Sequence, residues 1–194
     1  IPSCETLLGY IHAEFAKIGI DPDLVQMVPA PGSKDKTQRM LEKADLLVVT
    51  GSQDNVRRAY SSGTPAVAVG AGNVTVIVDE TADLQAAAQK IAASKTFDNA
   101  TSCSSENAVI VLDEVYDTFV AEMVKARGAL IPAKGADSII AKLWPDGHLN
   151  RSVIAQDARV MIKALELKDQ VPCGTEFVAV ETDGIGPDHP LSGE

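Results

Sequence analysis

The sequence predicts an α/β fold with a parallel sheet. Two observations support this class: several short segments are continuously apolar, and segments with helical spacing lie between them. Continuously apolar strands are typical of parallel sheets, because helices cover both faces of such sheets. The repeated order of strand, tight turn and helix indicates a doubly wound arrangement.

The first part of the chain is expected to contain three helices and three strands. Ser3 and Ser33 are good N-cap residues for the first two helices, because a hydroxyl can accept a hydrogen bond from a free backbone N–H. The two strands 46–50 and 66–69 are expected to be buried. The predicted order is helix 4–18, strand 24–28, helix 33–44, strand 46–50, helix 53–61 and strand 66–69.

A second unit is expected to begin near Gly70-Ala71-Gly72-Asn73. The sequence therefore predicts two domains, residues 1–70 and residues 71–194. Thr81 is the expected cap of a long, alanine-rich helix. The Gly- and Pro-rich tail after 184 is expected to be loop. The predicted order is strand 76–78, helix 81–97, strand 108–112, helix 115–127, two helices between 135 and 167, and strand 177–180.

Composition and charge narrow the class of function. The chain has 194 residues and a net charge of −10, from 17 basic and 27 acidic side chains. Binding to nucleic acid needs clustered Lys and Arg, so we expect no such partner. No apolar run is long enough to span a membrane, and no secretory leader is present, so we expect no membrane association. The Ile1 start and the Glu194 end predict a piece of a longer polypeptide.

The three cysteines are widely spaced and odd in number, at Cys4, Cys103 and Cys173. This pattern does not predict a disulfide framework, and no ligand spacing predicts a metal site. A reducing compartment, and hence the cytoplasm, is expected. Cys4 and Cys173 are interpreted as packed residues.

Cys103 differs from the other two because small and hydroxylated residues surround it. The run is Thr101-Ser102-Cys103-Ser104-Ser105. A thiol in such a loop is open to substrate and can be held as thiolate by nearby N–H groups. A reduced structural cysteine is the alternative, and the polar loop favours a nucleophile. Among the histidines, His189 is the one candidate partner, although a loop-shaping role suits it better than catalysis.

Two further segments have the composition of ligand-binding turns. Thr50-Gly51-Ser52 follows an apolar strand and precedes a helix, whose N-terminus attracts phosphate. A plain tight turn is the alternative, since the usual G-x-G-x-x-G pattern is absent. Gly70 and Gly72 allow the backbone to approach a ligand, or form a linker between two units.

Taken together and in this order, these landmarks resemble the aldehyde dehydrogenase superfamily, and more closely its acylating, coenzyme A-dependent branch. The form of the Asn99–Asn107 run is most similar to enzymes that act on sulfoacetaldehyde. The resemblance covers essentially the whole chain. It is carried by V-V-T-G-S (48–52), A-Y-S-S-G (59–63), V-G-A-G-N (69–73), S-K-T-F-D-N (94–99) and C-S-S-E-N (103–107).

The resemblance implies a Rossmann-type sheet in a cofactor domain, whose last part is 1–70, and a truncated α/β catalytic domain at 71–194. It implies that Cys103 is the nucleophile and that Thr50, Gly51, Ser52 and Gly70 lie against NAD or NADP. By the same resemblance, Glu194 would contact a cofactor ribose. The implied substrates are a small aldehyde and coenzyme A, and the implied assembly is a homo-oligomer, either a dimer or a tetramer.

Three positions depart from the family pattern. Hydrolytic members place a glutamate before their Gly-Gly pair to activate water, and Val69 occupies that position here. Valine cannot accept a proton, so a thiol such as coenzyme A is expected to resolve the acyl-enzyme. Ala100 stands where glycine is common, and Thr75 where proline is common. A hydrolytic enzyme that uses another base, such as His189, and a non-catalytic α/β binding module are the alternatives.

Overall fold

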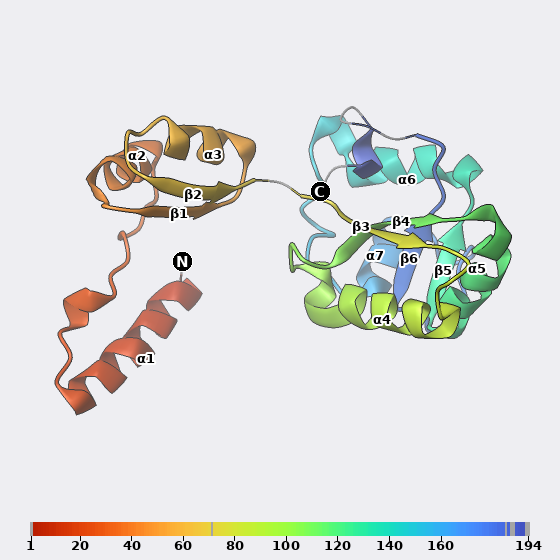
Figure 1. The fold of residues 1–194 in the computed structure, drawn as a ribbon, viewed down its shortest axis with the longest axis horizontal. Helices are drawn as coiled ribbons and strands as arrows, with labels where there is room; N and C mark the ends of the chain where they lie inside the picture. The colour runs from red at the N-terminus through yellow and green to blue at the C-terminus, as the bar shows by residue number, and fades with distance from the viewer. Residues whose placement is uncertain (1, 71, 185, 187–188, 193–194) are drawn as a thin grey trace. The chain divides into compact units, whose positions relative to one another are not determined.

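The computed structural model describes residues 2–70, 72–184, 186 and 189–192. By contacts between residues, the chain divides into two compact units, Ile1–Gly70 and Ala71–Glu194 (Figure 1). Helices alternate with parallel strands in both units, which confirms the predicted α/β class. None of the described helices is long and apolar enough to cross a membrane.

The first unit is built around one parallel strand pair. Strands β1 (Leu47–Thr50) and β2 (Ala66–Val69) pair in register, with Leu47 opposite Ala66 and Thr50 opposite Val69. Ser33 and Ser52 cap the helices α2 and α3, since their hydroxyl oxygens accept hydrogen bonds from backbone N–H groups. The helical elements are α1 (Pro2–Ile18), η1 (Pro22–Leu24), α2 (Lys34–Lys43) and α3 (Gln53–Tyr60).

The core of this unit lies on one face of the strand pair. Leu41 of α2, Leu47 of β1 and Ala59 of α3 are buried together. The other face is open: Val48 is 77% exposed and Val67 is 60% exposed. The expectation that these strands are buried is therefore wrong for the face that carries Val48 and Val67. Within the unit, helices cover only the face that carries Leu47.

Residues 24–28, all of which are described, form no strand, so that prediction is wrong. Instead Pro22–Leu24 is a 3₁₀ turn, capped by the side chain of Asp21, which accepts from the Asp23 N–H at 2.9 Å. The apolar residues after the turn remain exposed, including Val25 and Val28. A strand forms only against a neighbouring strand, and β1 pairs with β2; the Val25 carbonyl instead contacts Nε2 of His12 at 2.8 Å.

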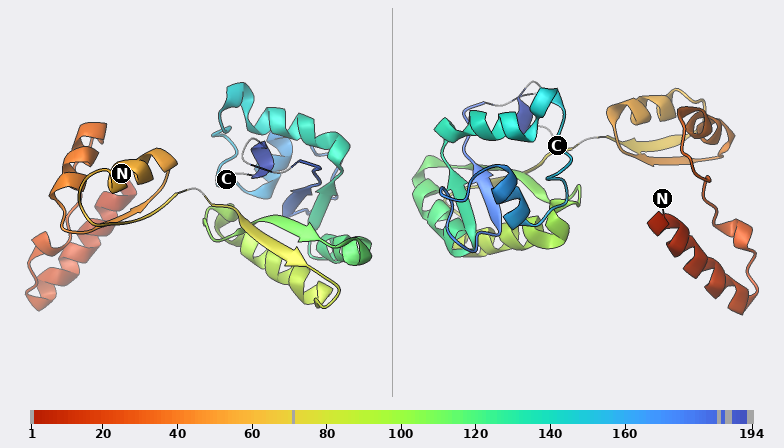
Figure 2. Two further views of the ribbon diagram at one scale, coloured as in Figure 1. Left: turned by 45° about the horizontal axis from the view of Figure 1, so that its top comes forward. Right: turned by 180° about the vertical axis from the view of Figure 1, so that it is seen from behind.

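The second unit contains two parallel strand pairs, β3 with β4 and β5 with β6. Helix α4 lies along one face of β3 and β4 (Figures 1 and 2). The elements are β3 (Val74–Val78), α4 (Leu84–Thr96), η2 (Phe97–Ala100), β4 (Glu106–Val111), η3 (Asp113–Val115), α5 (Tyr116–Lys125), β5 (Gly128–Ile131), η4 (Ala133–Gly135), α6 (Ala136–Leu143), η5 (Pro145–Gly147), α7 (Ala158–Ala164), β6 (Phe177–Val180) and η6 (Pro190–Ser192).

Two separate apolar clusters hold this unit together. One joins β3 and β4 to helices α4 and α5, and its buried residues are Val78, Ala88, Ile91 and Phe119. The other joins β5 and β6 to helices α6 and α7, and its buried residues are Ile131, Ile139, Leu165 and Leu167. Each cluster fixes one strand pair against two helices.

Three details of this unit differ from the sequence prediction. Helix α4 is capped by Asp83, whose carboxylate accepts from the Ala86 N–H at 3.0 Å; Thr81 instead donates its hydroxyl to Asp79 at 2.7 Å. The sequence does not predict strand β5, because this strand has only four residues and begins with a glycine. The two helices predicted between 135 and 167 are present but shorter, and residues 148–157 lie outside both.

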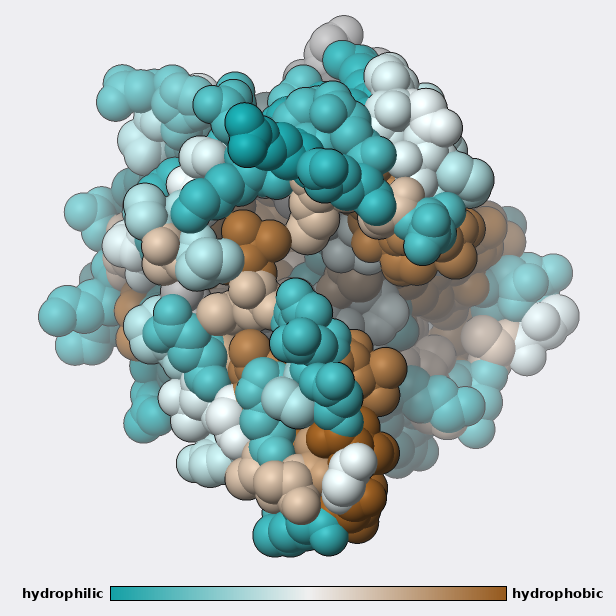
Figure 3. Space-filling model, turned by 90° about the vertical axis from the view of Figure 1, so that its left-hand side faces the viewer, coloured by the Kyte–Doolittle hydropathy of each residue, from teal (hydrophilic) through white to brown (hydrophobic). Residues whose placement is uncertain are grey.

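Large apolar side chains also reach the surface of both units. Apolar patches interrupt the polar residues on the face drawn in Figure 3. Across the described residues, the exposed large apolar side chains include Val69 and Ile77, at 63% and 69% exposure, and Phe97 at 71%.

Candidate active site

Cys103 lies in a short loop between the end of α4 and the start of β4. The Ser105 N–H donates to the Ser102 carbonyl at 3.1 Å, so Cys103 occupies the first corner of a β-turn. Cys103 is exposed, whereas Ser105 is 4% exposed and anchors the end of the turn. The expected exposure of this thiol is therefore confirmed.

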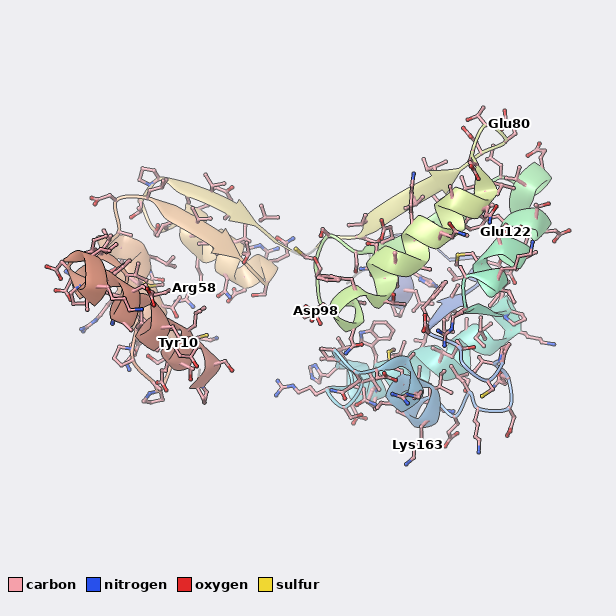
Figure 4. All side chains as sticks on the ribbon, turned by 90° about the horizontal axis from the view of Figure 1, so that it is seen from below. Tyr10, Arg58, Glu80, Asp98, Glu122 and Lys163 are labelled. Carbon is pink, nitrogen blue, oxygen red and sulfur yellow. The ribbon has the colours of Figure 1, made fainter. Side chains whose placement is uncertain are left out.

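The backbone just before the turn is left-handed at three consecutive residues. Asp98, Asn99 and Ala100 have φ values of 51°, 50° and 58°, and none of them is glycine. Thr101 closes this segment, because both its N–H and its hydroxyl donate to the Asp98 carbonyl, at 3.0 and 2.5 Å. Figure 4 shows Asp98 at the C-terminal end of α4. The left-handed segment sets the direction in which the chain enters the Cys103 turn.

Hydroxyl groups flank the thiol on both sides. The Ser102 and Ser104 hydroxyl oxygens are 2.8 Å apart and share a hydrogen bond. The Ser104 N–H also points to the Ser102 hydroxyl oxygen, at 3.4 Å. These contacts hold the turn in a polar setting, in which a developing oxyanion is better stabilised than in an apolar pocket.

The base of the loop is closed by a charged side chain. Lys95, in the last turn of α4, donates from Nζ to Oδ1 of Asn107 in β4 at 2.7 Å. Burial lowers the pKa of Lys95, and the charge of Glu106 partly opposes this shift. Glu106 Oε2 is buried without a hydrogen-bond partner among the described residues. Lys95 therefore joins the two ends of the segment that carries Cys103.

The strand pairing brings another predicted segment close to this loop. Val74, at the start of β3, pairs with Glu106, and Thr75 pairs with Ala108, so Asn107 is an additional residue in β4. Such a bulge redirects side chains and is frequent beside active sites. The Gly72-Asn73 segment thus leads directly into the strand that lies beside the end of the Cys103 loop.

The four described residues predicted to bind the cofactor come together in the first unit. Thr50 ends β1 opposite Val69, and the Gly51 N–H donates to the Val69 carbonyl at 3.3 Å. Gly51 has a φ of 142°, which favours glycine. Ser52 caps α3 by accepting from the Asn55 N–H. Gly70 follows β2 at the same edge.

Gly70 is closely approached by a side chain of α3. A Cβ atom at this position would lie 2.5–2.9 Å from the amide atoms of Gln53. This edge combines a helix N-terminus with two glycines, Gly51 and Gly70, an arrangement that suits a phosphate group. Cys103 lies in the other unit, and Glu194 lies outside the described residues.

The remaining candidate residues have local roles or exposed positions. His189 contacts the Thr182 hydroxyl through Nε2 at 3.1 Å, and its Nδ1 accepts from the Leu191 N–H at 3.3 Å. These contacts fit the predicted loop-shaping role. The prediction that Cys4 and Cys173 are packed is wrong, because both are exposed. Cys173 lines a cavity of about 740 Å³ in the second unit.

Sequence reasoning missed two residues that hold the Cys103 loop. In the sequence Lys95 and Asn99 stand out only as parts of the S-K-T-F-D-N motif, but Lys95 bonds to Asn107, and Asn99 donates from Nδ2 to the Ala155 carbonyl at 3.3 Å. A signal existed for Asn99, because asparagine is enriched in left-handed backbone. Within the described parts of the chain, no group of three or more His, Cys, Asp or Glu residues could hold a metal ion.

Comparison with known proteins gives a consistent result. Residues 3–139 match the model of the aldehyde dehydrogenase family. Sulfoacetaldehyde dehydrogenase (acylating) of Cupriavidus necator is 47% identical over 192 residues, which are 99% of this chain and 39% of that protein. The chain thus spans about two fifths of the length of this relative and of two others, and about one fifth of the length of aldehyde-alcohol dehydrogenases such as that of Clostridium acetobutylicum.

Solved structures show the same fold. Propionaldehyde dehydrogenase of Rhodopseudomonas palustris, with bound CoA and an acylated cysteine, has a TM-score of 0.75 and 26% identity, covering 92% of this chain and 40% of that one. An engineered glycolyl-CoA reductase with bound NADP+ has a TM-score of 0.76 and 26% identity, with the same coverage of 92% and 40%.

Proposed function

Because this chain belongs to the aldehyde dehydrogenase family, we propose that it is the part of a coenzyme A-acylating aldehyde dehydrogenase that carries the catalytic cysteine. The observation that supports this most strongly is the exposed Cys103 in a hydroxyl-rich β-turn. Relatives named as acylating enzymes, and the acylated cysteine of the R. palustris enzyme, support the same chemistry. A non-catalytic module would have no need of such a turn.

In this proposal the Cys103 thiolate attacks the carbonyl carbon of a small aldehyde and forms a carbon–sulfur bond. Backbone N–H groups near Cys103 stabilise the resulting oxyanion. When bound, NAD(P)+ would supply the oxidation by accepting the hydride that the aldehyde carbon loses as the adduct collapses. Cys103 then carries a thioester. The thiol of coenzyme A loses its proton to solvent and attacks this thioester as thiolate, and Cys103 leaves as thiolate.

The cofactor is assigned to the carboxyl edge of β1 and β2. Thr50, Gly51, Ser52 and Gly70 lie at this edge, and their amide-rich backbone suits the diphosphate of NAD or NADP. The NADP+ found in the engineered glycolyl-CoA reductase supports a nicotinamide nucleotide as cofactor. Contact of Glu194 with a ribose stays a prediction.

Coenzyme A, rather than water, is proposed as the acyl acceptor. Val69 stands where the resembled hydrolytic enzymes have their base, and a valine side chain cannot activate water. His189 was the alternative base, but both of its ring nitrogens are engaged within the tail. These two observations favour the acylating reaction over the hydrolytic alternative.

The proposed substrate is sulfoacetaldehyde. The relative at 47% identity and a second one from Bilophila wadsworthia, at 40%, both carry that substrate in their names. Parallel assays of the natural full-length protein with sulfoacetaldehyde, propionaldehyde and succinate semialdehyde test the choice. A kcat/KM that is not highest for sulfoacetaldehyde contradicts it.

The reaction class is tested by following NADH or NADPH formation with and without coenzyme A. We expect sustained turnover only with coenzyme A, and acyl-CoA as the product. Sustained turnover without the thiol would favour the hydrolytic alternative. We also propose that the full-length protein is cytoplasmic and forms a homo-oligomer. Light scattering of the purified protein tests the oligomeric state.

A further inference from the structure

We propose that Asn99 is a positioning residue: its side-chain amide holds the Cys103 loop in place by donating to the Ala155 carbonyl. The two residues are separated by 56 positions in the sequence, and Nδ2 lies 3.3 Å from the carbonyl oxygen. This inference rests on the proposed function, since it takes Cys103 as the nucleophile.

The part of the loop that precedes Cys103 needs an anchor, because buried Ser105 anchors only its other end and the local hydrogen bonds do not fix where the loop begins. Thr101 bonds to Asp98, and Ser105 bonds to Ser102, so these contacts shape two successive turns without tying them to the rest of the unit. Lys95 closes the base of the loop through Asn107. The left-handed segment remains to be fixed, and it directly precedes the Cys103 turn.

Asn99 lies in the middle of that left-handed segment, four positions before Cys103. Its hydrogen bond reaches the segment before α7, where Ala155 is also left-handed, with a φ of 54°. The bond therefore links two unusual backbone segments that are far apart in the sequence. A shift of about 1 Å in a reacting group can cost about a hundredfold in rate, so a fixed loop matters for catalysis.

Asparagine combines two properties at this position. It tolerates left-handed backbone better than most residues, and its amide supplies an N–H donor. Substitutions separate these properties. Asn99→Asp retains the shape and the backbone tolerance but has no donor when ionised, and Asn99→Gly retains the backbone freedom without any side chain. Asn99→Ala loses both properties.

The test measures kcat and KM of the natural full-length enzyme with aldehyde, NAD(P)+ and coenzyme A. We expect Asn99→Asp and Asn99→Gly to lower kcat by about tenfold to a hundredfold, with KM values within about threefold of the wild type. Gln156→Ala is the matched control, because Gln156 adjoins Ala155 but donates to the neighbouring Ile154 carbonyl. It is expected to retain the wild-type kcat.

A second readout does not depend on aldehyde oxidation. The rate at which iodoacetamide alkylates Cys103, located by peptide mass spectrometry, is expected to fall at least threefold in both variants. If the wild type oxidises no aldehyde but alkylation slows in the variants, the proposed function fails and the positioning role stands. Wild-type kcat in both Asn99→Asp and Asn99→Gly, with an active parent enzyme, would overturn the positioning role.

Discussion

At Cys103 the setting of the side chain matters more than its exposure. All three cysteines are exposed, so accessibility alone does not identify a nucleophile. Cys103 differs because a β-turn, two neighbouring serine hydroxyls and a left-handed entry segment fix its surroundings. The sequence signal, a thiol among small hydroxylated residues, reflects this local geometry.

Replacing Cys103 with serine tests its assigned role. A serine hydroxyl is a far weaker nucleophile at neutral pH than a thiolate, so Cys103→Ser is expected to abolish NAD(P)H formation. Cys4→Ser and Cys173→Ser are matched controls, because both remove an exposed thiol elsewhere. They are expected to retain activity within about twofold of the parent. Measurable turnover by Cys103→Ser would contradict the assignment.

Ala100 supplies a prediction about stability. Its φ of 58° places a Cβ atom in a left-handed conformation, which costs about 1 kcal/mol relative to glycine. Ala100→Gly is therefore expected to raise the free energy of unfolding by up to about 1 kcal/mol, measured by urea denaturation. Ala100→Val is expected to lower it, because a β-branched side chain fits this backbone less well. Equal stability of the two variants would show that the backbone is not left-handed here.

At the scale of secondary structure, most elements could be predicted because their signals are local. Ser33 caps α2 as predicted, and apolar runs mark β1, β2, β4 and β6, whereas Ser3 lies inside α1 and is not its cap. The predictions failed at two kinds of position: where a strand depends on a partner strand, and where two side chains could cap the same helix. Residues 24–28 have strand composition but no described partner strand, and Asp83 caps α4 instead of Thr81.

The candidate site was predictable in part. The residues with a local signature, namely Cys103 and the Thr50–Ser52 turn, could be chosen from the sequence. The residues that support the loop could not, because the contacts of Lys95 with Asn107 and of Asn99 with Ala155 depend on tertiary structure. The sequence also does not predict that only one face of β1 is buried, because the apolar composition of β1 is typical of a strand covered on both faces.

Gly70 allows a test of the cofactor edge. Gly70→Ala is expected to weaken NAD(P) binding about tenfold. The added methyl group would occupy space in which the ligand contacts the backbone of residue 70. Isothermal titration measures this change. Stability should change little, since the methyl group meets the flexible end of Gln53. The double variant Gly70→Ala with Gln53→Ala removes that collision, so restored affinity would attribute the effect to Gln53 rather than to the ligand.

Tyr116 predicts a pH-dependent stability of the second unit. Its hydroxyl donates to Glu181 Oε1 at 2.7 Å, and this hydrogen bond to a carboxylate, with burial, raises the pKa of Tyr116 to about 12. A pKa raised on folding stabilises the folded state below the unfolded pKa of about 10, and this contribution is lost as the pH rises toward 12. Tyr116 must be protonated to donate.

Tyr116→Phe is therefore expected to be less stable than the parent by about 1 kcal/mol at pH 8, measured by urea denaturation. The difference should shrink between about pH 10 and pH 12 as Tyr116 ionises in the parent. A difference that stays constant over this range would show that the Tyr116–Glu181 hydrogen bond does not contribute to stability.

At the scale of the whole molecule, the chain is about two fifths of the length of the two acylating sulfoacetaldehyde dehydrogenases that it matches, and its two units carry different parts of the proposed reaction. The first unit gathers the residues assigned to the nicotinamide nucleotide. The second holds Cys103. Val69, at the end of the first unit, offers no proton acceptor, which makes the fate of the acyl group the central question.

The most direct measurement is the mass of the Cys103 peptide during a reaction without coenzyme A. With aldehyde and NAD(P)+ alone, we expect an acyl group to accumulate on Cys103 with about one NAD(P)H formed per site. Adding coenzyme A should then remove this group and release acyl-CoA. An unmodified Cys103 peptide, or an acyl group that disappears as carboxylic acid before coenzyme A is added, would contradict the account.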